Sequence, residues 1–302
     1  MKKPKKNLIS MRHREMLAGY LMITPLMIGV FVFFLGAFFQ NIYFSFTNRS
    51  GFGIPVFIGL DNYVRLFQDA TFFRALNNTL MYVAICVPFV VVLAIAQACL
   101  LNSKIKGIGI IRVLIFLPAI TLPAAISLVW RWLMNYQFGF INSVLRNIGI
   151  EQIAWLSNPN LVIYSVSVVF IWASVAFQSI ILLAGLQGIP ECYVEAAKID
   201  GAKRGQLFFR ITLPLLSPAI FFVCVTTFIN VFQIFDFIYL MIPIESVATP
   251  AARSLVSFFF EETFIRFNMG YGAAISLMLF LLIFVITLIQ FALQKKFVFY
   301  DD

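Results

Sequence analysis

Two long apolar runs of the chain are separated by Tyr193-Val-Glu-Ala-Ala-Lys-Ile-Asp-Gly-Ala202, which is followed by Phe208-Phe-Arg-Ile-Thr-Leu-Pro-Leu-Leu216. Pro190 suits the first turn of a helix and Gly201 suits its end, so a short helix with small side chains is predicted between them. A second short helix is expected at 203–211, because prolines interrupt the chain beyond it. Small side chains allow another backbone to approach closely, while an amphipathic helix lying on a membrane surface remains the alternative.

The composition places the rest of the chain in a membrane. Apolar residues make up 62% of the 302 residues and charged residues 12%, and the mean hydropathy is +0.95, which would leave a soluble domain with an apolar surface. Six predominantly apolar runs reach the roughly 20 residues that cross the hydrocarbon core as a helix. They are 16–39, 73–101, 108–133, 161–186, 215–241 and 271–294.

These runs predict an all-α, polytopic membrane protein with six transmembrane helices. Each run is longer than the roughly 9 to 11 residues of a membrane β-strand, and none alternates as a barrel strand does. With the amino terminus inside, about two thirds of the 22 Lys and Arg residues lie in the inner segments. We therefore expect both termini and the loop around Glu195 to face the cytoplasm.

Three segments are expected along the chain. A basic cytoplasmic arm at 1–15 precedes a six-helix membrane domain at 16–294, and a short cytoplasmic tail follows at 295–302. The polar loop is the part of the membrane domain at 187–217.

Several classes of site are excluded by residue type. His13 is the only histidine, which leaves no His-based metal site or catalytic triad. The four cysteines are spread singly, which fits neither a disulfide framework nor a Cys-x-x-Cys metal site. No Walker-type nucleotide motif is present. The basic residues that give the net charge of +9 lie at the ends of the apolar runs, where they meet anionic lipid headgroups. The charge therefore does not indicate binding to nucleic acid.

Five segments carry a resemblance to the permease subunits of ABC importers. The loop at 195–214 resembles the EAA loop of that family and is the strongest match. The other four are Ile58-Gly-Leu-Asp-Asn-Tyr63, Phe138-Gly-Phe-Ile-Asn142, Val231-Phe-Gln-Ile-Phe-Asp-Phe-Ile-Tyr239 and Met269-Gly-Tyr-Gly-Ala-Ala-Ile275. Together they look like the carbohydrate branch, which includes the larger maltose permease subunit and the glycerol-phosphate and lactose permeases.

The chain departs from this branch in two respects. It carries Met241-Ile-Pro-Ile-Glu-Ser246 where many members have Thr-Gly-Gly-Pro, so its outer gate loop is expected to differ. It also lacks the extra amino-terminal spans and the large external domain of the maltose subunit, which leaves the six-span core.

The resemblance implies a type I ABC importer permease core without catalytic residues. In that family the loop docks on a separate dimeric ATPase that holds ATP and Mg, so no cofactor is expected on this chain. A second permease subunit in a heterodimer, an extracytoplasmic solute-binding protein, a carbohydrate substrate and the lipid of a prokaryotic cell membrane are the other implied partners. Coupling to the ATPase is expected at Glu195, Ala196, Ala197, Asp200, Gly201, Ala202 and Leu207.

Polar residues inside the runs point to a transport face, because they are costly unless they meet a cavity or another helix. Thr227, Asn230 and Ile234 recur at helical spacing in the fifth run. Ser174, Phe177 and Gln178 do so in the fourth. The resemblance to the maltose subunit places sugar contacts at Ala173, Ser174, Phe177, Thr227, Asn230, Val231 and Ile234. Alternatively, these side chains only join neighbouring helices.

Two charged residues lie near the predicted outer ends of the runs. Asp236 is the only carboxylate inside a run, and its place near the helix end argues against proton transfer. Its match to the Phe-Asp-x-Ile-Tyr pattern of the family implies instead a gate contact or a pair with an Arg of the partner subunit. Arg131 lies between Trp130 and Trp132, whose rings suit an interfacial belt or a platform for a sugar. No cation lies in the middle of a run, which favours a neutral saccharide, and an oligosaccharide in particular.

Two other functions remain open. A secondary sugar transporter driven by ions would need carboxylates or broken helices at mid-membrane, for which Asp236 alone is weak support. A non-transporting scaffold would need neither the aligned polar face nor the loop. The predicted function is therefore an ATP-driven carbohydrate importer subunit.

Overall fold

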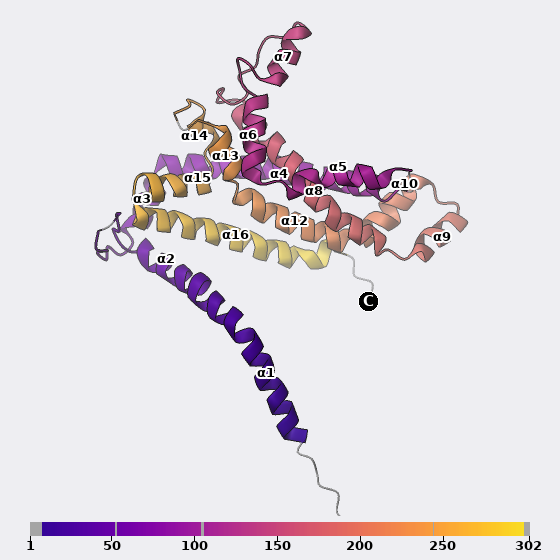
Figure 1. The fold of residues 1–302 in the computed structure, drawn as a ribbon, viewed down its shortest axis with the longest axis horizontal. Helices are drawn as coiled ribbons and strands as arrows, with labels where there is room; N and C mark the ends of the chain where they lie inside the picture. Colours follow the sequence, from indigo (N-terminus) through magenta and orange to yellow (C-terminus); the bar gives the residue numbers. More distant parts are fainter. Residues whose placement is uncertain (1–7, 52, 104–105, 244, 299–302) are drawn as a thin grey trace, which may run out of the picture.

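The computed structural model describes residues 8–51, 53–103, 106–243 and 245–298. Within these ranges the chain forms helices and loops, with no strand and one isolated bridge between Thr47 and Phe57. Figure 1 shows a bundle of long helices and one helix, α1, that runs away from it. The first residues of the predicted basic arm (1–7) and the last of the tail (299–302) lie outside the described residues, as does position 244 of the departing outer loop.

Four of the six predicted spans are continuous helical segments. The first runs from Glu15 to Ser45 through α1 (Leu8–Gly29), η1 (Val30–Gly36) and α2 (Ala37–Ser45). The other three are α4 (Ala70–Leu101), α8 (Val162–Gln187) and α16 (Met269–Phe297). Each is at least 26 residues long, which is enough to cross the hydrocarbon core. The prediction of an all-helical protein with several spans is confirmed.

The other two predicted spans are bent pairs of helices. The third run forms α5 (Ile108–Ile120) and α6 (Pro123–Leu133), which meet at 98°. Leu122 precedes a proline and has left the helical region, with a ψ of 133°. The fifth run bends by 65° before α12 (Ser217–Phe232), and its last residues form a separate helix, α13 (Asp236–Met241). The third and fifth predicted runs are therefore broken helices, and the chain has six spans if each bent pair is counted as one.

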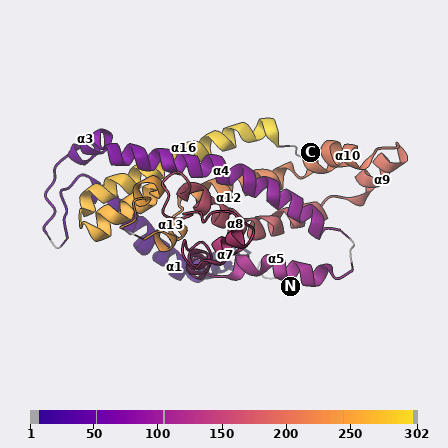
Figure 2. The same cartoon turned by 90° about the horizontal axis from the view of Figure 1, so that it is seen from above.

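The core lies where α4, α8 and α12 pack together. Small side chains recur on one face of α4, where Cys86, Ala94 and Ala98 are buried, so neighbouring helices can approach closely. A Cβ at Gly185 of α8 would lie 2.9 Å from the side chains of Ala219 and Leu216, which leaves no room for a larger residue. α16 packs against α12 and α2, and Figure 2 shows the long helices running along one another.

The first span is uncovered along its length. In its most apolar stretch of 18 residues, no residue is buried by the rest of the chain. In the corresponding stretches of α4, α8 and α16, 33% to 56% of the residues are buried. Met22 is 82% exposed and Phe33 is 76% exposed. Lipid or a second protein must therefore cover this helix, because so large an apolar surface is unfavourable in water.

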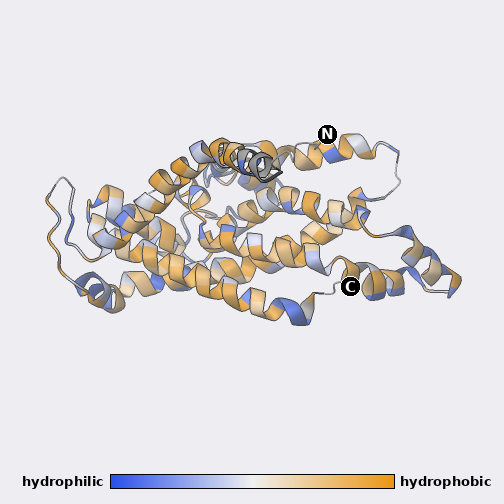
Figure 3. Ribbon diagram, turned by 90° about the horizontal axis from the view of Figure 1, so that it is seen from below, coloured by the Kyte–Doolittle hydropathy of each residue, from blue (hydrophilic) through white to orange (hydrophobic). Residues whose placement is uncertain are grey.

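The two ends of the bundle carry different short helices. The end that we call the α3 end holds α3 (Asp61–Gln68), α14 (Thr249–Ala252), α15 (Leu255–Phe260) and η3 (Glu261–Ile265). The α9 end holds α9 (Glu191–Ile199), α10 (Arg204–Leu207), η2 (Phe208–Thr212) and α11 (Leu213–Leu215). α7 (Phe140–Asn147) projects beyond α6. Figure 3 shows hydrophilic residues gathered at both ends and hydrophobic residues between them, as expected of a bundle that crosses a membrane.

At the α3 end, side-chain hydrogen bonds join the first span to α3 and α16. Asn62 is buried and donates to the backbone oxygens of Ser45 and Thr47, at 2.8 Å in both cases. The Tyr271 hydroxyl donates to the Asp69 carboxylate at 2.8 Å. These bonds connect segments that lie far apart in the sequence.

A buried carboxylate extends the same network. Glu262 is only 1% exposed and accepts from Arg266 at 2.6 Å and from the Asn268 side chain at 3.0 Å. The backbone N–H of Gly270 donates to the Arg49 oxygen at 2.9 Å, and a Cβ at position 270 would overlap the Thr47 oxygen. We call this network the polar clasp. Its members are Ser45, Thr47, Arg49, Asn62, Asp69, Glu262, Arg266, Asn268, Gly270 and Tyr271.

Candidate coupling loop and transport face

The polar loop at the α9 end folds as its sequence predicts. α9 begins after Pro190, and Glu191 stands in its first turn, where the helix dipole favours a carboxylate. Gly201 has a φ of +79°, in the left-handed region that favours glycine. The backbone N–H of Ala202 donates to the Ala197 oxygen at 2.9 Å and closes the helix end. The predicted stop at Gly201 is therefore confirmed.

The second predicted helix, at 203–211, forms as two shorter pieces. The backbone N–H of Lys203 donates to the Gln206 side chain at 2.9 Å and so starts α10. The chain then continues into the wider turns of η2. Phe208 is half-buried, but Phe209 is 66% exposed. The loop thus presents an aromatic ring beside its basic side chains.

The residues predicted to couple to an ATPase lie mostly on the surface of the α9 end. Ala197 is buried, and Ala202 and Leu207 are half-buried. The four exposed members of the set are Glu195, Ala196, Asp200 and Gly201. The two carboxylates form no ion pair within the described part of the chain. The loop therefore has an open outward face that carries both carboxylates and basic side chains, with Ala197 buried beneath it.

A polar cavity of about 570 Å³ lies beneath this loop. It is bounded by the ends of α4 and α8, by α9 and by η2, and its lining includes Asn102, Gln187, Glu191, Glu195 and Lys198. Glu195 is both exposed and part of this lining. Glu195 thus belongs both to the exposed face of the loop and to a cavity that extends to the ends of α4 and α8.

The predicted transport residues of α8 point in different directions. Gln178 is 2% exposed, and its Oε1 accepts from the Thr226 hydroxyl of α12 at 3.5 Å. Ala173 and Ser174 are half-buried, and Phe177 is 56% exposed. Gln178 thus joins two helices of the bundle, whereas Phe177 lies on its open surface.

The predicted face of α12 is divided in the same way. Asn230 is exposed, but Thr227 and Val231 are 1% and 0% exposed. The prediction that Ile234 shares a helical face with Thr227 and Asn230 is wrong, because α12 ends before it. Ile234 is buried in the break that follows, and its backbone oxygen accepts from the Ser254 hydroxyl at 2.8 Å. Phe177 and Asn230 are thus the predicted contacts with the most open side chains.

The break in the third span is a feature that the sequence prediction missed. Thr121 and Leu122 are exposed there, and Leu122 is 73% exposed. Irregular backbone at membrane depth is tolerated only where protein buries it or where it lines a water-filled cavity. Pro118 and Pro123 were the available signal, because proline ends or kinks a helix. The break therefore belongs beside a partner or an aqueous path rather than against lipid.

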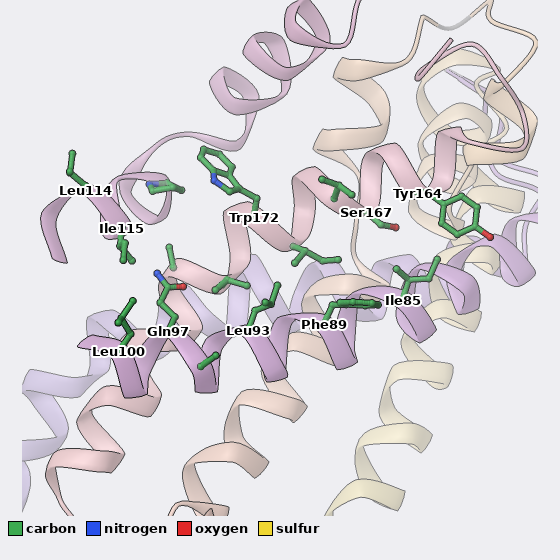
Figure 4. A pocket seen from close by; sticks show the side chains of 16 residues that line it. Ile85, Phe89, Leu93, Gln97, Leu100, Leu114, Ile115, Tyr164, Ser167 and Trp172 are labelled. Atoms are coloured by element: carbon green, nitrogen blue, oxygen red, sulfur yellow. The ribbon is translucent and has the colours of Figure 1, made fainter. Parts of the chain in front are cut away.

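A large cavity of about 940 Å³ lies between α4, α5 and α8 (Figure 4). Figure 4 shows Gln97, Tyr164 and Ser167 among aliphatic side chains and aromatic rings such as those of Phe89 and Trp172. None of the predicted transport residues lines it. A sugar needs several hydrogen-bond partners, so this lining suits apolar chains better than a sugar.

Both charged residues near the predicted outer ends have defined positions. Asp236 is exposed as the first residue of α13, so the prediction that it lies inside a span is wrong, because the fifth run breaks before it. Arg131 lies in the last turn of α6 and donates to the Leu240 oxygen at 3.3 Å. Trp130 packs edge-on against Trp172, with ring centroids 5.6 Å apart. Arg131 thus joins α6 to α13.

The match to a protein family extends over most of the bundle. Residues 70–298 match the family described as the binding-protein-dependent transport system inner membrane component. The chain belongs to this family. YesP, a probable ABC transporter permease of Bacillus subtilis, is 35% identical to this chain; the match covers 96% of this chain and 94% of YesP. The trehalose/maltose transport system permease protein MalF of Thermococcus litoralis is 32% identical over 92% of this chain and 94% of its own.

Solved transporters share the fold of this inner membrane component. A chain of a bacterial alginate ABC transporter, crystallised with its alginate-bound periplasmic protein, has a TM-score of 0.86 at 22% identity over 96% of this chain and 98% of that chain. The predicted helical core of a type I ABC importer permease is therefore confirmed. Family and relatives also confirm the prediction of a multi-pass transport component rather than an enzyme.

Proposed function

We propose that the chain is one of two permease subunits of an ATP-driven importer that takes up a carbohydrate. The observation that carries the proposal is the exposed loop at the α9 end, with the polar cavity of about 570 Å³ beneath it. The carbohydrate is favoured because relatives at this level of identity include MalF and the lactose transport system permease protein LacF of Rhizobium radiobacter, which is 31% identical.

The loop is the proposed docking site of a dimeric ATPase, which would bind ATP and Mg²⁺. Its exposed Glu195 and Asp200 offer charge-assisted contacts to basic groups of that partner. α9 follows α8 after the short link at 188–190, so a push on α9 is transmitted to α8 and to the core. Closure of the ATPase dimer on ATP binding would supply this push.

The second permease subunit is supported by three surfaces that the chain leaves open. They are the uncovered first span, the exposed break at Thr121 and Leu122, and the open side chains of Phe177 and Asn230. Irregular backbone at membrane depth needs protein or an aqueous path beside it, and an apolar helix face can be covered by either lipid or protein. A heterodimer that covers them would form the transport path along the open side of α8 and α12.

Sugar contacts are proposed on that open side. Ser174, Phe177 and Asn230 would meet the substrate, and a second group would shape the wall behind them. This second group consists of Gln178, Thr227, Val231 and Ile234. None of the seven is charged, which favours a neutral saccharide over an anion at mid-membrane depth.

The proposed orientation places the α9 end and both termini in the cytoplasm of a prokaryotic cell. The α3 end then faces outward, where an external solute-binding protein would deliver the sugar. The distribution of Lys and Arg in the sequence supports this orientation. An ion-driven carrier is not favoured, because Asp236 is exposed and lies outside the long helices.

Purification with bound partners and reconstitution in vesicles tests the proposal. A P-loop ATPase and a second permease are expected to remain bound to the chain. Uptake of a labelled saccharide is expected to require ATP on the cytoplasmic side of the vesicle membrane and the binding protein on the opposite side. A chain that purifies alone and takes up sugar under a proton gradient without ATP would overturn the proposal.

A further inference from the structure

A third cavity lies at the far end of α6; it is smaller than the two described above and has a more polar lining than the cavity between α4, α5 and α8. Its volume is about 270 Å³, and it is bounded by the end of α6, the loops on either side of α7 and the segment after α13. Its polar and aromatic lining includes Arg131, Asn135, Tyr136, Gln137, Trp155 and Ser246. None of the sugar contacts proposed above lines it.

We propose that this cavity is a saccharide subsite that holds one sugar ring by two adjacent oxygen atoms before the substrate passes between the spans. The inference rests on the proposed function, because it assumes a carbohydrate substrate. The volume of about 270 Å³ is below the roughly 300 to 1,000 Å³ of pockets for drug-sized ligands, so the cavity suits one ring of a saccharide.

The cavity walls are positioned by Asn142, which is 1% exposed. Its Nδ2 donates to the backbone oxygens of Tyr136 at 3.1 Å and of Ile153 at 3.0 Å. Its Oδ1 accepts from the Trp155 indole N–H at 3.1 Å. One buried amide thus fixes both the loop that carries Tyr136 and the Trp155 ring. A side chain held as the Trp155 ring is held loses little freedom when a ligand binds.

Local contacts also fix the backbone of the loop before α7. A Cβ at Gly139 would overlap the backbone oxygens of Leu133 and Asn135, so only glycine allows this close approach. The Asn135 Oδ1 accepts from the backbone N–H groups of Gln137 at 2.9 Å and Phe138 at 3.2 Å, which turns the chain around the cavity. The Phe138-Gly-Phe-Ile-Asn142 segment noted in the sequence does not line the cavity itself, but its Gly139 and Asn142 hold in place the residues 134–137 that do.

Arg131 is the one charged residue among the described residues that line the cavity. Its Nη1 donates to the Leu240 oxygen at 3.3 Å, and no described carboxylate forms an ion pair with it. A guanidinium presents parallel N–H groups, which match two adjacent oxygens, either vicinal hydroxyls or a carboxylate of a sugar acid. Tyr136 is 48% exposed and adds an aromatic surface against which a ring can pack.

Substitution of Tyr136 tests the subsite, with Phe138→Ala as the matched control. Phe138 is 61% exposed in the same loop but does not line the cavity. The uptake kinetics of maltotriose and of trigalacturonate are measured with the reconstituted transporter. Tyr136→Ala is expected to raise KM roughly tenfold with kcat nearly unchanged, as the loss of one pocket contact does, while Phe138→Ala leaves KM nearly unchanged. An unchanged KM in Tyr136→Ala would overturn the inference.

Arg131→Lys distinguishes a pair of vicinal hydroxyls from a carboxylate, because it keeps the positive charge and removes the parallel N–H groups of the guanidinium. A larger rise in KM for maltotriose assigns vicinal hydroxyls, and a larger rise for trigalacturonate assigns the carboxylate. If Tyr136→Ala weakens binding of the sugar-free binding protein as much as it raises KM, the cavity is a protein-docking surface and the inference fails. If the unsubstituted transporter takes up neither these probes nor any other saccharide, the proposed function itself fails.

Discussion

The polar clasp and the loop at the α9 end are stabilised in opposite ways. In the clasp, polar side chains bind one another and the backbone across long stretches of sequence, as Tyr271 and Asp69 do over 202 residues. In the loop, Glu195 and Asp200 are exposed, and the shape depends on local backbone features such as the turn at Gly201. The hydrogen bonds of the clasp form within one chain, whereas the loop has an open face for a partner.

This difference separates stability from coupling. A change in the clasp should lower the unfolding temperature and leave the response to substrate intact in the molecules that remain folded. A change in the loop should do the reverse, because the loop contributes little buried surface. Measuring both properties for each variant therefore tests the comparison directly.

The largest effect is expected from Gly201→Val. The φ of +79° at this position is unfavourable for a β-branched residue by about 1 to 2 kcal/mol, so the end of α9 must shift. We expect the saccharide-stimulated part of ATP hydrolysis to be abolished in the reconstituted transporter, with membrane insertion and unfolding temperature nearly unchanged.

Gly205→Val is the matched control for this variant. Gly205 lies in the same loop, a Cβ there meets nothing within 4 Å, and its φ is not in the left-handed region. It should retain most of the stimulated hydrolysis. Equal loss in both variants would mean that bulk in the loop, rather than the backbone turn, disturbs coupling.

The second effect is on stability and comes from Gly270→Ala. The new methyl group would overlap the Thr47 oxygen, so the start of α16 and the end of the first span must separate. We expect a loss of about 2 to 3 kcal/mol, as for other overpacked sites, measured as a lower unfolding temperature in detergent. Gly109→Ala is the control, because nothing lies within 4 Å of that position in α5. Unfolding at the unsubstituted temperature would show that the clasp can open without cost.

A smaller loss is expected from Glu262→Ala. This variant leaves the Asn268 amide without its acceptor, but Arg266 has a side chain that is 55% exposed and can return to water. The expected cost is therefore about 1 to 2 kcal/mol, below that of breaking a fully buried ion pair. Glu262→Gln keeps an acceptor for Asn268 and should recover part of the loss. Equal unfolding temperatures for the two variants would argue that the bond to Asn268 contributes nothing.

The parts of the fold that the sequence predicts are those that depend on local chemistry. The length of the apolar runs predicts the spans, and Gly201 predicts the end of α9 because its turn requires one particular backbone region. The break before Ile234 could not be predicted in this way, since no proline or glycine marks it. A hydrogen bond from Ser254, 20 residues away, occupies the freed oxygen at that break.

In the candidate sites, too, features that depend on local sequence could be predicted, and features that depend on contacts between distant segments could not. Glu195 and Asp200, which the resemblance of the loop singles out, are both exposed, as a docking role requires. Helical spacing alone could not show that Gln178 is oriented toward Thr226, because that depends on which face of α8 meets α12. The role of Asn142 was also hidden, since its partners Tyr136 and Trp155 come together only when two loops fold over the end of α6.

The smallest expected effect is the pH dependence of the clasp through Asp69. Burial raises the pKa of this carboxyl, but hydrogen bonds from the Tyr271 hydroxyl and from Thr71 outweigh it, so the net pKa lies below the ordinary value of 3.8. A carboxyl with a lowered pKa stabilises the folded state above its unfolded pKa, and this contribution is lost as the pH falls through the folded pKa.

We therefore expect the unfolding temperature of the unsubstituted protein to fall between about pH 5 and pH 3 by slightly more than that of Asp69→Asn. The difference should correspond to less than about 1 kcal/mol, because the site is partly open to solvent. The asparagine can still accept from the backbone N–H of Thr71, which donates to Asp69 at 2.7 Å, so the variant should fold. Identical pH profiles would show that the clasp is held by hydrogen bonds whose strength does not depend on the charge of Asp69.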